Sequence, residues 1–181
     1  MTDTARDAWP ELPFAEWQGT CATPHMWCQI VGKVRLALTP WVNHSWHATL
    51  YVTARGLTTS LVPHGARSFE IELDLVDHAL VVRATDGAAR RLALTARPVA
   101  ELHAELMAAL ADLGLAVAIH GRPNEVSDPI RFADDRVHST YVPEHAHRFW
   151  RVLVQVDRVL KLFRPGRFRV AGSGMMRISA T

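Results

Sequence analysis

The stretch FEIELDLVDHALVVRATDGAARRLALT, residues 69–95, decides the fold class of this 181-residue chain. Apolar and acidic residues alternate over residues 69–75, the period of a strand with one buried face. A second apolar run over residues 80–85 ends at Asp86-Gly87, a dipeptide that favours a tight hairpin turn. Residues 91–95 then pair back on it. We therefore predict an antiparallel meander with one apolar and one polar face.

The regions around this meander extend the pattern in both directions. Upstream, residues 46–55 also alternate, and residues 57–62 fit a further strand. Downstream, residues 115–119 form a short apolar run. The sheet is therefore expected to hold five to six strands.

Three segments have helical spacing of their apolar residues. The first starts at Thr23-Pro24, where threonine is a good N-cap and proline suits the first turn, and runs to Leu38. The second covers residues 98–113 and ends before Gly114, and the third covers residues 143–163. The predicted fold class is α+β, an antiparallel meander sheet of five to six strands with three main helices packed on one face.

Length and composition favour one folded domain, which we place at residues 1–164. The chain is 49% hydrophobic and 21% charged, which excludes a disordered protein. Its net charge is only +2, so we expect neither nucleic acid nor a membrane as a partner. That total hides two unlike parts. Residues 1–144 hold 12 basic and 17 acidic residues, whereas residues 145–181 hold 8 basic and 1 acidic.

The N-terminus and the cysteines indicate a compartment. The first eight residues lack the apolar core of a signal peptide, and no apolar run reaches the length of a membrane span. Cys21 and Cys28 are too few for a disulfide framework. We expect a cytoplasmic protein with reduced cysteines and no membrane segment. Cys28 is either a small buried hydrophobe or, with His25 one turn away, an activated thiolate.

The densest polar cluster lies at residues 43–47, NHSWH. His44 and His47 alone are too few ligands for a metal, so no metal site is assigned. On a strand, His47, Tyr51 and Arg55 would share one face and offer donors to an anionic or carbonyl ligand. The alternative is a solvated sheet face whose side chains pair across strands with acidic residues of the meander.

Two further features add candidates. On the first predicted helix, polar side chains recur every four residues, at His25, Gln29 and Lys33, and so share one helix face. Asp157 falls within the apolar arc of the last helix, where a carboxylate must be paired or protonated. It is either a structural ion pair, for example with Lys33 or Arg35, or a pocket carboxylate that acts in acid/base chemistry. The candidate catalytic residues are therefore His44, His47 and Asp157. The candidate ligand-binding residues are His25, Gln29, Lys33, Asn43, Tyr51 and Arg55.

Seven segments carry a resemblance to a known family. They are WPELP (9–13), QIVGK (29–33), TPW (39–41), NHSWH (43–47), LYVTARGLTT (50–59), DRVH (135–138) and HRFW (147–150). Over residues 9 to about 164 the chain resembles the bacterial family called domain of unknown function 5996. The resemblance implies no activity, cofactor or catalytic residue. It also implies longer relatives, so we expect a truncated C-terminus and a disordered tail over residues 165–181.

Two functions from different classes fit these observations. The first is a pocket at the sheet edge that binds a small anionic or polar ligand, with Lys33 and Arg55 holding the anion and His44 or His47 moving a proton if there is chemistry. The second is a non-catalytic module that binds a partner protein through the polar sheet face or the basic last helix. No nucleophile motif or glycine-rich phosphate loop assigns a reaction.

Overall fold

The computed structural model describes residues 8–166. Along the chain the elements are α2 (Phe14–Leu38), the 3-10 helix η1 (Asn43–Ala48), β1 (Tyr51–Val52), β2 (Gly56–Thr58), β3 (Val62–His64), β4 (Arg67–Asp74), β5 (Ala79–Ala84), β6 (Ala89–Ala93), α3 (Val99–Asp112) and α4 (Pro143–Gly166). The strands form one six-stranded sheet of order β1-β2-β4-β5-β6, in which β3 also pairs with β4. All the pairings are antiparallel, so the predicted α+β class is confirmed.

Strand β4 organises the sheet because it pairs with β2, β3 and β5. Its apolar residues Phe69 and Ile71 are fully buried, as the alternating pattern predicts. The predicted hairpin also forms. Gly87 has a φ of 92° and donates its N–H to Ala84 O at 3.0 Å. That positive φ is open to glycine without strain, so the dipeptide makes the turn.

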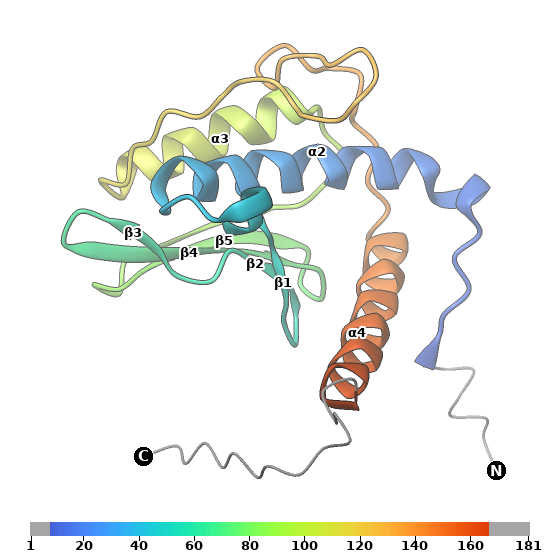
Figure 1. The fold of residues 1–181 in the computed structure, drawn as a ribbon. Coiled ribbons are helices and arrows are strands. Elements are labelled where there is room, and N and C mark those ends of the chain that lie inside the picture. The colour runs from blue at the N-terminus through green and yellow to red at the C-terminus, as the bar shows by residue number, and fades with distance from the viewer. Residues whose placement is uncertain (1–7, 167–181) are drawn as a thin grey trace, which may run out of the picture.

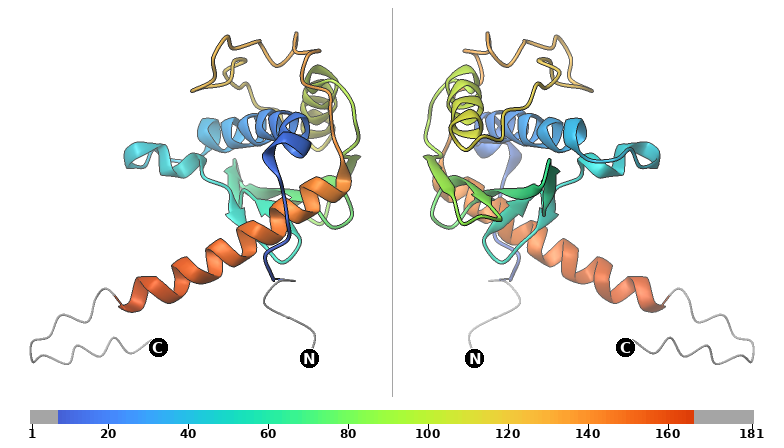
Figure 2. Two further views of the ribbon diagram at one scale, coloured as in Figure 1. Left: turned by 90° about the vertical axis from the view of Figure 1, so that its right-hand side faces the viewer. Right: turned by 90° about the vertical axis from the view of Figure 1, so that its left-hand side faces the viewer.

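The helices form a second layer on the sheet. Figure 1 shows α2 and α3 over one sheet face. Helix α4 begins beside α2 and runs past the end of the sheet, and Figure 2 shows its C-terminal part leaving the body of the molecule. Only the first part of α4 therefore belongs to the packed core.

Helix α2 starts nine residues earlier than Thr23-Pro24, at Phe14. The helix keeps Pro24 in its interior although proline cannot donate the backbone hydrogen bond there. Tertiary contacts hold the first turns. Trp17 packs on Phe149 with ring centroids 5.0 Å apart, and Thr20 Oγ1 accepts a hydrogen bond from Val142 N. The prediction that this helix begins at Thr23-Pro24 was wrong, because the partners that hold its first turns are distant in sequence.

The predicted strand over residues 46–55 is also wrong. Its first part belongs to η1, and only Tyr51–Val52 forms a strand. His44 and Ser45 have φ values of 57° and 55°, in the left-handed region, which breaks an extended chain before it reaches the sheet. The strand ends at a turn in which Thr53 N donates to Gly56 O. The alternation of residue types was therefore not an alternation of faces.

Residues 115–119 form no strand. Leu115 is fully buried directly after α3, so the apolar run fills the core without a strand partner. The other helix predictions are confirmed, since α3 ends before Gly114, whose φ is 65°, and α4 starts at Pro143. Residues 165 and 166 continue α4, and the rest of the predicted disordered tail, residues 167–181, lies outside the described residues.

Gly56 gives the sheet its closest backbone approach. A Cβ added there would lie 1.8 Å from Leu73 O, so β2 and β4 would have to separate. We expect Gly56→Ala to lower the free energy of unfolding by about 2 kcal/mol, as measured by urea denaturation. Gly121→Ala is the matched control, because its Cβ would meet nothing within 4 Å. Equal stability of the two variants would contradict the register of β2 on β4.

Candidate functional site

A cavity of about 480 Å³ lies between α2, η1, the β1–β2 edge of the sheet and α4. Its polar lining comes from α2, from η1 and from the loop after α3, and consists of His25, Gln29, Lys33, Ser45 and Asn124. The remaining walls are Cys28, Gly32, Leu36, Ala48, Leu50, Val52, Leu57 and Leu153. We call it the outer cavity.

A second cavity of about 260 Å³ adjoins the first under α2, and we call it the inner cavity. The two share His25, Cys28, Leu57 and Leu153 in their linings. The rest of the inner lining is almost wholly apolar or aromatic and consists of Trp17, Thr20, Cys21, Pro24, Trp27, Leu73, Leu75, Ala146 and Phe149. The combined space is polar and cationic at one end and apolar at the other.

Among the described residues that line the two cavities, Lys33 is the only one with a charge at neutral pH. Its side chain is 5% exposed, and Nζ donates to Asn124 Oδ1 at 3.0 Å. Within residues 8–163, no carboxylate lies within ion-pair distance of Nζ. Burial lowers the pKa of Lys33 from its ordinary value of 10.5. The cavity therefore contains a buried cation that lacks a counter-charge among the described residues.

Gln29 and Asn124 join α2 to the loop that follows α3. Gln29 Nε2 donates to Asn124 O at 3.0 Å, and Asn124 N donates to Gln29 Oε1 at 3.4 Å. His25 lies one turn away, with its Nε2 atom 3.4 Å from Gln29 Nε2. The polar stripe of α2 thus lines the cavity as a set. Sequence reasoning missed Asn124, because it lies in a loop without periodicity.

The structure separates Asn43, His44 and His47 from the cavity lining. Asn43 and His44 are exposed on η1. His47 is 5% exposed, and its Nδ1 accepts a hydrogen bond from Val42 N at 3.1 Å. That hydrogen bond joins the residue before η1 to the C-terminal part of η1. A role for His44 or His47 as the proton carrier of this cavity is therefore not supported by their positions.

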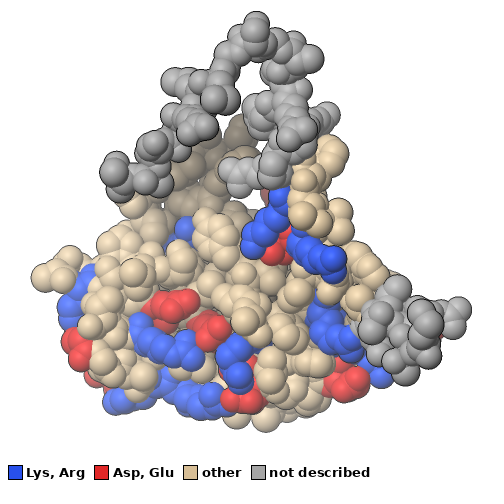
Figure 3. Space-filling view, turned by 90° about the horizontal axis from the view of Figure 1, so that it is seen from below, with Lys and Arg blue, Asp and Glu red and all other residues tan. Residues whose placement is uncertain are grey.

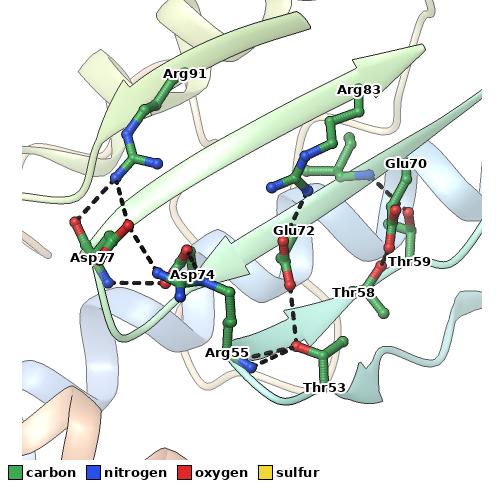
Figure 4. A network of polar contacts seen from close by, with 12 residues as sticks. Thr53, Arg55, Thr58, Thr59, Glu70, Glu72, Asp74, Asp77, Arg83 and Arg91 are labelled. Atoms are coloured by element: carbon green, nitrogen blue, oxygen red, sulfur yellow. Dashed lines mark hydrogen bonds and ion pairs between the residues drawn. The ribbon is translucent and has the colours of Figure 1, made fainter. Parts of the chain in front are cut away.

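Tyr51 and Arg55 also lie outside the cavity lining, and the prediction that they share a strand face with His47 was wrong. Tyr51 is 46% exposed, and its Oη accepts from Arg35 Nη2 at 3.3 Å. Arg55 instead binds two carboxylates, Asp74 at 2.6 Å and Asp77 at 2.7 Å, as Figure 4 shows. Its charge is already neutralised within the chain.

The polar face of the sheet has the cross-strand pairs that the alternative interpretation predicted. Glu72 accepts from Arg83 Nη1 at 2.8 Å and from Thr53 Oγ1 at 3.1 Å, and Glu70 accepts from Thr58 Oγ1 (Figure 4). Figure 3 shows acidic and basic side chains interspersed on this side of the molecule. Such a face has little unpaired charge to offer a ligand.

Asp157 lies in the exposed C-terminal part of α4. Its side chain is 35% exposed and pairs with Lys161 at 2.7 Å. Of the two alternatives, Asp157 therefore forms an ion pair, although not with Lys33 or Arg35, and it is not a buried pocket carboxylate. The apolar arc that was expected to bury it leaves the body of the molecule, and Val156 and Leu160 are 39% and 60% exposed. Asp157 lines neither cavity.

Cys28 lines both cavities but has the properties of an inert thiol. Burial, with a smaller contribution from Cys21, raises its pKa to about 12. We expect alkylation of Cys28 by iodoacetamide at neutral pH to be roughly 100-fold slower in the folded chain than in urea, because the thiolate reacts. Mass spectrometry of the alkylated peptide measures this ratio. Equal rates would restore the activated-thiolate interpretation.

Neither a metal-binding cluster nor a membrane-spanning helix is present in the described part of the chain. Residues 8–166 hold no cluster of three or more His, Cys, Asp or Glu that could bind a metal ion. Over the same residues no helix has the length and apolarity needed to span a membrane. The cavities next to α2 are therefore the best candidate for a functional site.

Comparison with known proteins gives one match. The model of a family described as "Family of unknown function (DUF5996)" matches residues 9–172. No curated protein and no solved structure matches the chain. The match covers most of the 181 residues and agrees with the resemblance that the seven sequence segments carry. The chain belongs to this family of unknown function.

Proposed function

We propose that the protein binds a small carboxylate with an aliphatic or aromatic tail. In this proposal the carboxylate lies beside Lys33 in the outer cavity, and the tail passes Cys28 and Leu153 into the inner cavity. The observation that carries the proposal is that Lys33 is only 5% exposed and that its ammonium has no carboxylate partner among the described residues. This proposal names a ligand class and assigns no reaction.

Electrostatics supports an anion at this position. An ammonium that loses water without gaining a counter-charge destabilises the fold, and an anionic ligand removes that cost. Lys33 uses one of its donors on Asn124, so others are available for a carboxylate. Hydrogen bonds between charged partners are also stronger than those between neutral ones.

The inner cavity supports an apolar tail. Trp17, Trp27 and Phe149 surround it, together with leucines from the sheet and α4. A pocket of this kind binds mainly by removing apolar surface from water, and each buried methylene contributes about 0.8 kcal/mol. Affinity should therefore rise about fourfold with each added carbon until the cavity is full.

Isothermal titration calorimetry tests the proposal with butanoate, hexanoate and octanoate. We expect affinity to rise along this series. Octan-1-ol and octylamine are the matched controls, because they have the same tail with a neutral or a cationic head. The proposal predicts binding at least tenfold weaker for both. Equal affinities for octanoate, octan-1-ol and octylamine would contradict the proposal, as would the absence of a heat of binding with any carboxylate.

The alternative of a protein-binding module at the polar sheet face has less support, because the charges of that face are paired within the chain.

We also propose that the protein is located in the cytoplasm. Both cysteines are free, which supports a reducing compartment.

A further inference from the structure

The outer half of α4, residues 156–163, is an amphipathic helix without a covering element among the described residues. Its exposed large apolar side chains include Val156, Val159, Leu160 and Leu162, with exposed fractions from 39% to 70%. At 100° per residue, all of these except Leu162 fall within an arc of about 100°. Arg158 and Lys161 lie on the opposite side of the helix.

A second exposed apolar group lies on the same side of the molecule. Trp41 and Trp46, in and just before η1, are 70% and 69% exposed. Figure 2 shows η1 and the outer half of α4 projecting from the body in the same general direction. Tryptophan has an apolar ring and a polar N–H, and it is enriched where proteins meet the interface of a membrane with water.

Basic residues are concentrated in the C-terminal region and acidic residues in the rest of the chain, which favours an anionic partner for the C-terminal region. From Val156, where the outer half of α4 begins, to the C-terminus the sequence holds six basic residues and one acidic residue, Asp157, which pairs with Lys161. Residues 1–144 carry an acidic excess of five. An anionic surface would therefore attract the C-terminal region and repel the remainder of the chain, which orients the molecule.

We infer that the outer half of α4, together with Trp41 and Trp46, docks on the surface of a membrane that contains anionic lipids. The helix lies in the interface with its apolar arc toward the acyl chains and its basic residues at the headgroups. This contact needs no membrane-spanning helix. It also goes beyond the expectation from the small net charge, because the basic region is local. The inference is independent of the proposed ligand.

Vesicle co-sedimentation of the full chain tests this inference. We expect at least tenfold tighter binding to vesicles of phosphatidylcholine with phosphatidylglycerol than to phosphatidylcholine alone, and weaker binding as salt is raised. Leu160→Glu should reduce binding to the anionic vesicles at least fivefold. Leu61→Glu is the matched control and should change nothing, because Leu61 is also exposed, at 63%, but lies between β2 and β3.

Loss of folding would not account for weaker vesicle binding by either variant. Both leucines are exposed, so both variants should keep the parent's circular dichroism and melting temperature. Failure of the intact chain to bind anionic vesicles at low salt would overturn the inference, as would equal losses in the two variants. A dimer in analytical ultracentrifugation that Leu160→Glu dissociates, without vesicle binding by the parent, would assign the apolar arc to a second copy instead.

Discussion

Lys33→Met is expected to weaken octanoate binding by roughly 10- to 100-fold, which corresponds to the ~1.5–3 kcal/mol of a hydrogen bond to a charged group. Methionine keeps the volume and the apolar stem of the side chain but removes the ammonium. The free energy of unfolding should change by less than about 1 kcal/mol, because removing an uncompensated buried charge offsets the lost bond to Asn124. Calorimetry and urea denaturation measure the two quantities.

Lys161→Met is the control for this experiment, since Lys161 is 72% exposed on α4 and lies outside the cavity linings.

Octanoate binding by the parent should also weaken as the pH becomes alkaline and Lys33 loses its proton. Because burial lowers the pKa of Lys33, this loss of binding should begin at a lower pH than the pKa of an exposed lysine would give. An unchanged octanoate affinity in Lys33→Met would show that Lys33 does not bind the carboxylate.

The second large effect is expected at Asp74, where Asp74→Ala should lower the free energy of unfolding by about 3 kcal/mol at neutral pH. The side chain is 2% exposed. It accepts hydrogen bonds from Arg55 Nε at 2.6 Å, Asp77 N at 2.9 Å and Val76 N at 3.0 Å. Alanine leaves three donors without their acceptor at the turn between β4 and β5.

The pH dependence of this effect has a definite sign. Burial alone would raise the pKa of Asp74, but the hydrogen bonds from Arg55 and the two backbone N–H groups outweigh it, so the pKa lies below its ordinary value of 3.8. A carboxyl whose pKa is lower in the folded state stabilises the fold above the unfolded pKa. The difference between the parent and Asp74→Ala should therefore shrink as the pH falls below about 3.8.

Asp77→Ala provides the matched comparison. Asp77 binds the same arginine at 2.7 Å but is 53% exposed, so we expect it to contribute less than about 1 kcal/mol. Urea denaturation of both variants over a pH series gives the ranking. A loss at Asp77 as large as that at Asp74 would show that burial of the carboxylate is not what makes this pair strong.

The parts of the fold that could be predicted are those held by local patterns. Alternation in β4, the Asp86-Gly87 turn and the helical spacing of α3 all agree with the structure, because each buries a face that its own residues define. The start of α2 could not be predicted, because Thr20 and Trp17 find their partners beyond residue 140. The strand prediction for residues 46–55 failed because its first three residues belong to η1, which contains the left-handed His44 and Ser45. The turn closed by Thr53 and Gly56 then ends the strand after Val52.

Some residues of the candidate site could also be predicted from local patterns, and others could not. The stripe of His25, Gln29 and Lys33 was predictable, because a spacing of four residues places side chains on one helix face whatever the fold. Asn124 has no such signal, since only the packing of its loop brings it to Lys33. Arg55 was assigned to the site because cationic side chains suit anions, but the chain already provides its carboxylates.

A crystal structure of the full chain with octanoate would show whether a carboxylate binds at Lys33 with its tail in the inner cavity. We expect a carboxylate oxygen about 2.8 Å from Lys33 Nζ, the distance of a charge-assisted hydrogen bond, and alkyl carbons in contact with Phe149 and Trp17. Octanoate bound elsewhere, or with its carboxylate away from Lys33, would contradict the proposal.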